Sequence, residues 1–480
     1  MNPSTPMIAP SVRPRRWWLR GLLLLLAFMI LAPLLTIGSM MLSARNAWDA
    51  AEEEATRLDP RWKLMEIEAD RMQIADAENS ALFMNALRRK RGGFRGVGAV
   101  PNYDKIFEKL PPNVQLNGQQ LQVIRGELAK IAGPLQEARK LKDMPNGRIP
   151  VTYSDDWIST LLPEHQEART FADWLQHDAF DLAEDGKYDE ALESCQALLS
   201  ASGVFKEETF LISLLIRVAL QSISVTAMER VLAQGEPSDE TLQATQARLA
   251  KEINSSGWLQ AIRGERAGAQ FLFENIRSGK VTSTFRSING ARALDGVADW
   301  FVDTFPSAMV NYYPEYLRHM TRCVEIAKLP IQERGPRTKA WNDDTDKSKN
   351  PVIRILAPAL ANCHRAECRS QAWLRSAMVA MACERYRQKH ERWPATLDLL
   401  VKEKLLDAVP LDPIHGQPLR YLKTNYGVVI YSIGIDGIDN QGNIDHDRVH
   451  QPGFDVGFRL WDLGLRRMPP LPPVALPEGK

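Results

Sequence analysis

The uncharged run from Gly21 to Leu42, GLLLLLAFMILAPLLTIGSMML, constrains this chain more than any other feature. About 20 consecutive apolar residues span the hydrocarbon core of a bilayer as a helix, so the run predicts a transmembrane helix. Residues 1–20 carry arginines and no acid, whereas acidic residues follow the run closely. Because basic flanks stay in the cytoplasm, we expect a cytoplasmic basic stub at 1–20 and an exported remainder.

A cleaved signal peptide is the alternative to a retained anchor. Its apolar region should be about 7–15 residues long and end in a small-x-small cleavage site. Cleavage after Ala44 would put Leu42 three positions before the cut, so we expect a single-pass inner-membrane protein whose bulk is periplasmic. A reporter enzyme active only outside the cytoplasm, fused after residue 60, tests this topology. Activity only in the cytoplasm would contradict it.

The charges of the whole chain nearly cancel, with 60 Lys and Arg against 59 Asp and Glu. Proteins built around nucleic acid need a sustained excess of cations, so we expect no nucleic-acid partner. The strongest basic run, RRKRGGFRGVG at 88–98, is rich in glycine. We interpret it as a flexible loop of solvated charge.

Residues 43–329 predict an exported helical domain. Apolar residues recur there at spacings of three and four, as in Leu175, Ala179 and Leu182, which is the period of amphipathic helices. Residues 183–199, AEDGKYDEALESCQALL, resemble the turn and second helix of a tetratricopeptide unit. No second copy follows at an offset of about 34 residues, so we expect a local helical hairpin.

The polar segment 330–351 is flanked by prolines and offers almost nothing to bury. We predict a linker or exposed loop there, and with it the domain boundary. Residues 352–465 then predict a small α+β domain, with a helix to about His390, a hairpin turn at 424–427 and a strand at 427–434. The proline-rich residues 466–480 are expected to be extended and flexible.

Common catalytic motifs are missing from the sequence: there is no HExxH, GxSxG, P-loop or GxGxxG. His165 beside Glu164 and His177 beside Asp178 are the best acid–base candidates, yet their helical context predicts surface positions. We therefore assign no catalytic or cofactor-binding residue, and we expect no enzyme.

Two further clusters have a structural and a functional interpretation. Cys363, His364 and Cys368 lack the four ligands of a zinc site, so we expect small residues on a helical face, with a disulfide as the alternative. The RGER motif at 263–266 is interpreted as an ion-pair network on a helix. Binding of an anionic ligand through its guanidinium groups is the alternative.

The order of segments in the α+β domain resembles a known family. A helix ending in ERYRQKHERWPAT is followed by DPIHGQPLRY and then by YSIGIDGIDNQG. This is similar to the globular part of the major pseudopilin of type II secretion systems, over about 80 residues. The matching positions are Tyr386, Arg387, Trp393, Pro394, Asp412, Pro413, Gly416, Pro418, Tyr421, Ser432, Gly434, Asp436 and Gly437.

The chain departs from a true pseudopilin in the position of its membrane segment. In that family the hydrophobic helix continues directly into the globular domain and carries a glutamate near its start, whereas here it is remote and free of acids. We therefore expect a pseudopilin-like module rather than a pilus subunit. The whole architecture resembles uncharacterised membrane-anchored proteins of planctomycete bacteria. The expected fold is mainly α: a transmembrane helix, an all-helical central domain and a small pseudopilin-like α+β domain.

The acidic loop 436–447, DGIDNQGNIDHD, concentrates oxygen donors. Calcium takes six to eight oxygens with flexible geometry, and the resemblance implies a calcium site with Asp436 and Asp445 as ligands and Asp439 next. The alternative is a solvated turn whose side chains cap their own backbone. A calorimetric titration with calcium tests the prediction, and no heat would contradict it.

The favoured function is a non-catalytic structural or protein-interaction role in the cell envelope. An accessory role in a type II secretion-like apparatus is the first alternative, and an exported enzyme of unrecognised helical fold is the second. The sequence names no envelope partner.

Overall fold

Helices form most of the chain in the computed structural model, which describes residues 43–90, 92–108, 110–255, 257–281 and 310–475. Two compact units make up the chain, 1–54 and 55–480. A helix over residues 43–58 ends two residues before Pro60, because the residue before a proline avoids the helical region. The predicted stub at 1–20 and transmembrane helix at 21–42 lie outside the described residues.

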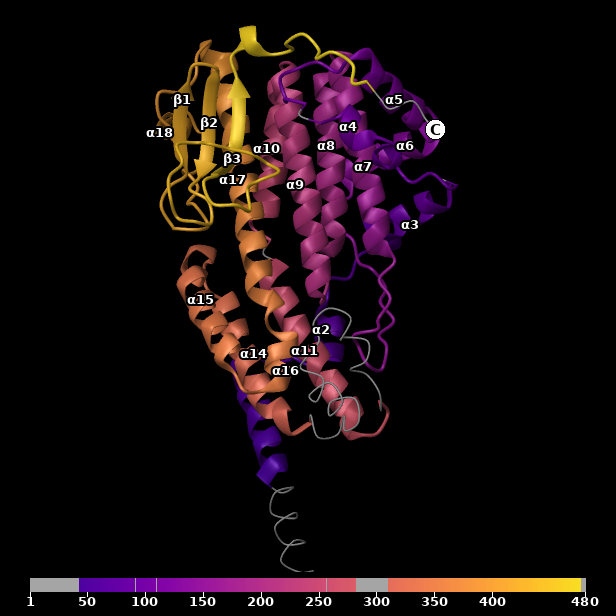
Figure 1. The fold of residues 1–480 in the computed structure, drawn as a ribbon, viewed down its shortest axis with the longest axis vertical. Coiled ribbons are helices and arrows are strands. Elements are labelled where there is room, and N and C mark those ends of the chain that lie inside the picture. The colour runs from indigo at the N-terminus through magenta and orange to yellow at the C-terminus, as the bar shows by residue number, and fades with distance from the viewer. Residues whose placement is uncertain (1–42, 91, 109, 256, 282–309, 476–480) are drawn as a thin grey trace, which may run out of the picture. The chain divides into compact units, whose positions relative to one another are not determined.

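Five helices of the second unit form its main helical layer, where neighbours lie side by side (Figure 1). They are α7 (Glu164–Glu184), α8 (Tyr188–Ser202), α9 (Leu211–Gln234), α10 (Asp239–Ile253) and α17 (Ala359–His390). Their apolar faces meet in one hydrophobic core that continues into the carboxy-terminal sheet. The spacing of three and four residues seen in the sequence is the reason, because it places each apolar set on one helix face.

The tetratricopeptide-like segment forms a local hairpin, as predicted. Gly186, with φ of 76°, lies in the turn between α7 and α8, and such positive φ favours glycine. Ala191 is fully buried in α8. A Cβ on Gly235 would lie 2.0 Å from the ring of Tyr188, so the start of α8 and the end of α9 pack as closely as backbone allows.

Helix α9 is the one described helix that is long and apolar enough to cross a membrane, by length and composition alone. More than half of its apolar window is buried in the protein. Buried core helices share this composition, and α9 contacts α7, α8 and α17.

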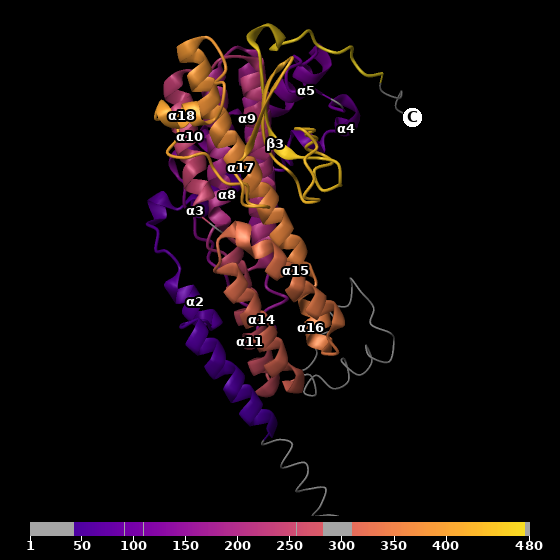
Figure 2. The same cartoon turned by 90° about the vertical axis from the view of Figure 1, so that its left-hand side faces the viewer.

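Further helices flank this layer and lie at its other end (Figure 2). Helix α11 approaches the segment before α9 closely, because a Cβ on Gly264 would lie 1.9 Å from the carbonyl oxygen of Thr209. These helices are α2 (Leu64–Asp70), α3 (Ser80–Lys90), α4 (Tyr103–Ile106), α5 (Gly118–Ala129), α6 (Ala132–Ala138), α11 (Gly257–Arg277), α14 (Tyr313–Ala327) and α16 (Pro351–Leu356).

The predicted linker at 330–351 is wrong: most of it is helix α15 (Ile331–Lys347). Its buried residues are Arg334, Thr338, Trp341 and Thr345, which recur at helical spacing and form one face. The Trp341 indole N–H donates to the His319 carbonyl at 2.9 Å. Composition concealed this face because three of its four residues are polar.

The carboxy-terminal module contains the predicted helix, hairpin and strand. Helix α18 (Asp398–Lys402) and an antiparallel sheet follow α17, and the sheet order is β1 (Arg420–Thr424), β2 (Gly427–Ser432), β3 (Val456–Trp461). Thr424 pairs with Gly427 across the predicted turn. The third strand was not predicted.

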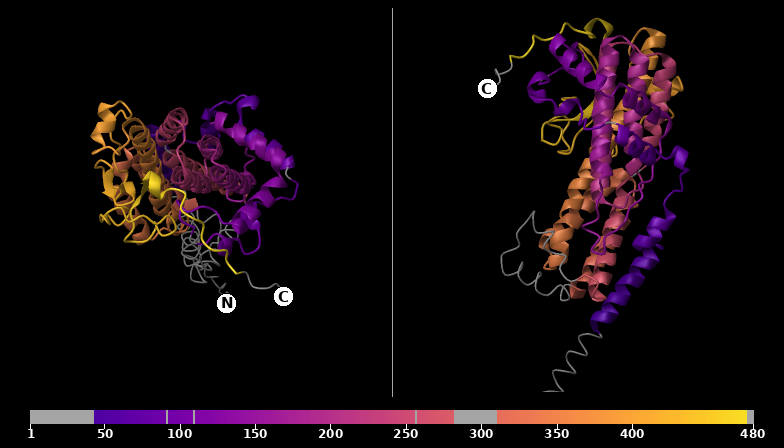
Figure 3. Two further views of the ribbon diagram at one scale, coloured as in Figure 1. Left: turned by 90° about the horizontal axis from the view of Figure 1, so that it is seen from above. Right: turned by 90° about the vertical axis from the view of Figure 1, so that its right-hand side faces the viewer.

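Residues 352–465 do not form a separate domain, in contrast to the prediction. The sheet packs on α17, which also contacts α9 and α10 (Figure 3), and residues 55–480 form one compact unit. The physical reason is that α17 buries residues all round, including Leu374, Val379 and Met381. The module and the helical body therefore share a core.

The glycine-rich loop predicted to be solvated packs in part against α7. The Asp173 carboxylate accepts hydrogen bonds from the amides of Val97, at 2.6 Å, and Gly98, at 2.9 Å. Val97 is fully buried, and the ring centroids of Phe94 and Trp174 are 5.8 Å apart. Consecutive backbone amides make a small anion-binding nest, so this loop receives the chain's own carboxylate.

Candidate functional site

A groove of about 480 Å³ opens beside the carboxy-terminal sheet, a volume typical of ligand clefts. Its lining includes Pro111 and Pro112 and the aromatic residues Tyr426 and Trp461. The remaining lining includes the amide side chains of Asn113, Gln441 and Asn443 and the guanidinium of Arg459. The groove therefore combines apolar rings with neutral hydrogen-bonding groups.

The two aromatic residues are positioned by the sheet. Tyr426 lies in the turn of the β1–β2 hairpin, and its carbonyl accepts from the Asp462 amide at 2.9 Å, one residue beyond Trp461. Gly427, with φ of 143°, pairs with Trp461. A Cβ there would lie 2.0 Å from the Leu460 carbonyl oxygen, so glycine is required for the turn and β3 to meet.

Two buried carboxylates shape the loops around the groove. Asp455 accepts hydrogen bonds from the amides of Asn440 and Gly442, at 3.3 and 2.8 Å, and burial is the main reason that its pKa is raised. Asp412 accepts from the Ser432 hydroxyl at 2.9 Å and from the Ile433 amide at 3.1 Å. Asp455 was not predicted from the sequence, where its one signal is an acid directly before the unpredicted strand β3.

The three predicted calcium ligands have different partners. Asp436 accepts from the amides of Ile438 and Gly453, Asp439 pairs with Arg420 at 2.6 Å, and Asp445 pairs with Arg448 at 2.6 Å. Among the described residues, His, Cys, Asp and Glu side chains nowhere form a group of three that could hold a metal ion. The loop geometry is that of side chains capping their own backbone, and calcium binding stays a prediction.

A buried acid of the helical body holds the acidic loop. Glu229 of α9 is fully buried, and its carboxylate lies 2.9 Å from Nε2 of His446. The Arg459 guanidinium donates to the Ile444 carbonyl and lies 4.0 Å from Glu229. The groove's one charged lining residue is therefore already engaged with its own surroundings.

The proline-rich tail is extended, as expected, but residues 466–475 are bound rather than flexible. Four amide side chains at alternate positions donate to carbonyls of the tail or of Leu465 just before it: Asn113 to Leu465 at 2.9 Å, Gln115 to Arg467 at 2.8 Å, Asn117 to Leu471 at 3.1 Å and Gln119 to Val474 at 3.3 Å. We call residues 113, 115, 117 and 119 the amide ladder. Backbone bonds between Asn113, Gln115 and Met468 reinforce it.

Two arginines attach the tail to the helical body. The Arg466 guanidinium is buried and pairs with Glu384 at 2.9 Å, and Glu384 also pairs with Arg387 at 2.7 Å. Arg467 donates to the carbonyls of Ala183 and Glu184 at the carboxy-terminal end of α7. A cation is favourable there because the helix dipole leaves partial negative charge.

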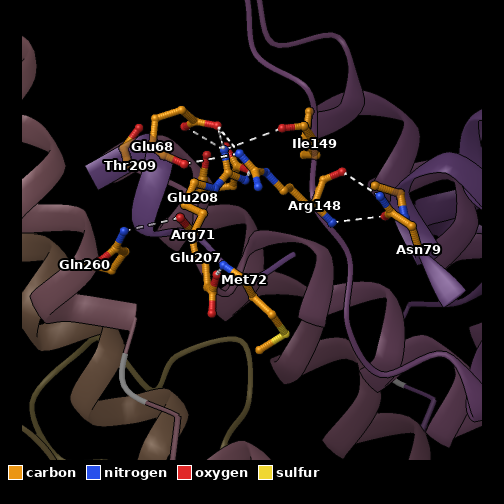
Figure 4. Close-up of polar contacts among 12 residues, drawn as sticks. Glu68, Arg71, Met72, Asn79, Arg148, Ile149, Glu207, Glu208, Thr209 and Gln260 are labelled. Carbon is orange, nitrogen blue, oxygen red and sulfur yellow. Dashed lines mark hydrogen bonds and ion pairs between the residues drawn. The ribbon is translucent and has the colours of Figure 1, made fainter. Parts of the chain in front are cut away.

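A second buried polar network joins three distant segments (Figure 4). Arg71 follows α2 and forms ion pairs with Glu208, before α9, and with Glu68 at 2.9 Å. Glu68 also accepts from Arg148 at 3.1 Å and from the Tyr153 hydroxyl at 3.0 Å. Arg71 and Glu208 are almost fully buried, so the network fixes these segments rather than meeting solvent.

Glu208 makes stability depend on pH. Burial raises its pKa to about 7 although Arg71 lowers it, so the folded state favours the protonated acid. Its stabilising contribution is complete below about pH 4, the unfolded pKa, and is lost as pH rises through about 7. In the wild type, the free energy of unfolding should therefore fall by on the order of 3 kcal/mol between pH 4 and 7. We expect Glu208→Gln to remove this decrease.

Chemical denaturation of the wild type and Glu208→Gln at several pH values measures this decrease. Burial also raises the pKa of Glu265 to about 7. The free energy of unfolding of the variant should therefore still fall with pH, but less steeply. Exposed Glu137, whose pKa the bonded Lys90 lowers, provides the control substitution Glu137→Gln. Identical slopes for Glu208→Gln and wild type would contradict the assignment.

The histidines singled out in the sequence are buried, contrary to the expected surface positions. His165 Nε2 lies 2.8 Å from the Ser213 hydroxyl, and His177 Nε2 lies 2.7 Å from the Tyr103 hydroxyl. Burial is the main reason that the pKa of each is lowered. The two histidines have separate partners and do not form one site. Each connects α7 to a different neighbouring segment.

The cysteine cluster and the RGER motif also have internal partners. Cys363 and Cys368 are free and buried, and His364 Nε2 lies 3.6 Å from the Cys368 sulfur. Arg263 and Arg266 both pair with Asp59, which is buried. The two arginines of RGER form ion pairs, as interpreted, but with a buried acid remote in sequence and not along their own helix face.

Comparisons with protein-family models, with curated proteins and with solved structures found no match.

Proposed function

We propose that this chain is a membrane-anchored envelope protein with a non-catalytic interaction role, and that the groove binds an extended, proline-containing segment of a protein partner. The anchor is residues 21–42, with the bulk of the chain in the periplasm. The groove lies in the pseudopilin-like module and on the neighbouring 111–113 loop.

The observation that carries the proposal is the lining of the groove. Tyr426 and Trp461 line it together with neutral amides such as Asn113 and Gln441. Proline-rich segments dock in aromatic-lined grooves because their extended conformation is preformed and loses little entropy on binding. Proline has no amide hydrogen, so such segments present mainly carbonyl acceptors, which side-chain amides can bind.

The amide ladder supports the same chemistry. It starts at Asn113, which also lines the groove and whose carbonyl accepts from the Met468 amide, and its members Asn117 and Gln119 bind the backbone of the proline-rich segment. The protein thus already recognises this type of segment on the adjoining surface. An accessory role in a secretion apparatus would rest on the resemblance alone.

Fluorescence anisotropy of a labelled proline octapeptide, titrated with the full chain in detergent, tests the proposal. We expect saturable binding that Tyr426→Ala weakens about 30-fold, the loss typical of an aromatic anchor. Tyr312→Ala is the matched control, since Tyr312 is an exposed tyrosine outside the groove. Equal affinities for wild type and Tyr426→Ala would contradict the proposal.

A further inference from the structure

The tail residues 468–475 are displayed rather than buried. Their backbone is bound at every third residue, Met468, Leu471 and Val474. An extended proline-rich chain has three residues per turn, so these positions share the edge that faces the amide ladder. The prolines between them, at 469, 470, 472 and 473, occupy the other edges and are exposed.

This arrangement preorganises a ligand. Prolines fix φ, and residues that precede a proline are held extended. The bonds from Asn117 and Gln119 remove further backbone freedom at Leu471 and Val474. Because the segment is already ordered, a partner that binds the proline edges would not have to offset the entropy lost on ordering it.

The groove of the same chain has the chemistry to receive this segment. Residues 468–475 carry no charge, and the one charged lining residue, Arg459, is engaged with Ile444 and Glu229. The segment presents proline rings and backbone carbonyls, and the groove presents aromatic rings and side-chain amides. The chain's own segment does not line the groove, because the ladder directs it over residues 113–119.

We propose that two copies of the chain form a symmetric dimer in which the proline edges of residues 468–475 of each copy occupy the groove of the other. This inference rests on the proposed function and names the partner as a second copy. Asn113 belongs to both the groove and the ladder, so donor and acceptor surfaces adjoin on one face. Such a face suits a two-fold, reciprocal contact, in which each copy uses the same patch.

Sedimentation of the full chain in detergent tests the dimer. We expect a two-chain species for the wild type, with a dissociation constant raised about 30-fold by Tyr426→Ala. A chain that ends at Arg467, which keeps both anchoring arginines, should be monomeric at the same concentration. A monomeric wild type, or a dimer unchanged by both alterations, would overturn the inference.

Disulfide trapping adds a direct reading of the contact. A mixture of Pro470→Cys chains and Gln441→Cys chains should form a crosslinked pair, since the five native cysteines are buried. The mixture of Met65→Cys with Gln441→Cys is the control, because Met65 is exposed on α2 and far from the tail in sequence. Equal crosslinking in the two mixtures counts against the dimer.

The two proposals fail in different ways. If the octapeptide binds at Tyr426 and the wild-type chain is monomeric, the groove function stands and the dimer is wrong. If the dimer forms, weakens on truncation and yet tolerates Tyr426→Ala, the tail binds elsewhere and the dimer inference is wrong, while the octapeptide titration alone decides the groove function.

Discussion

Replacing Arg71 with methionine should lower the free energy of unfolding by about 3–5 kcal/mol, because it leaves buried acids without their cation. Arg71 pairs with Glu208 and with Glu68, and its side chain is only 1% exposed. Methionine keeps the volume of the side chain but none of its charge. The network of Figure 4 would lose the group that joins α2 to the segment before α9. Urea denaturation followed by tryptophan fluorescence measures the change.

Arg61→Met is the matched control for this prediction. Arg61 precedes α2 and pairs with Asp70 at 2.6 Å, but the two side chains are 56% and 47% exposed. Ion pairs in water contribute at most about 1 kcal/mol. Similar small losses in the free energy of unfolding for the two variants would show that the buried Arg71 network does not stabilise the fold as predicted.

Replacing Glu384 with leucine should cost a comparable amount, about 3–5 kcal/mol, for the opposite reason. Glu384 is fully buried between the guanidinium groups of Arg387 and Arg466. Removing it leaves the buried Arg466 guanidinium without an acid, while Arg387 keeps only its ion pair with Glu236. We also expect faster hydrogen exchange in residues 456–475, because Arg466 holds the end of β3 and the start of the tail against α17.

The control for Glu384 is Glu403→Leu. Glu403 pairs with Lys389 at 2.7 Å near the surface, where the lysine side chain is 62% exposed, and its loss should cost less than about 1 kcal/mol. Faster exchange confined to residues 456–475 in Glu384→Leu, and absent from Glu403→Leu, is the expected pattern. Uniform exchange changes in both would argue against a local attachment.

Local sequence signals predicted the elements whose pattern is carried by a few neighbouring residues. The helical period of α7 and the hairpin at Thr424 and Gly427 are of this kind. The buried face of α15 was missed because Arg334 and Thr338 look solvated until the helices that pack against them are known. Arg334 pairs with Glu367 of α17 at 3.3 Å, which sequence alone does not bring near.

The candidate site shows the same division. The acidic loop was recognised from its composition, but its organisation depends on Asp455, which lies ten residues beyond Asp445 and caps Gly442. The groove joins the loop to Pro111 and Asn113, more than 300 residues earlier in the chain. Such a pairing is set by tertiary packing and has no signature at any fixed spacing.

Helix α17 has a consequence for how this protein can change over time. Since one side of it supports the sheet and the other packs on α9 and α10, the carboxy-terminal module cannot be exchanged as an independent domain. Recombination at any point between residues 330 and 358 would separate α17 from α9 and α10 and leave one of its apolar sides uncovered. Sequence drift in α9, α10 and the sheet must therefore be mutually compensating, so the two halves are expected to be inherited as a single unit.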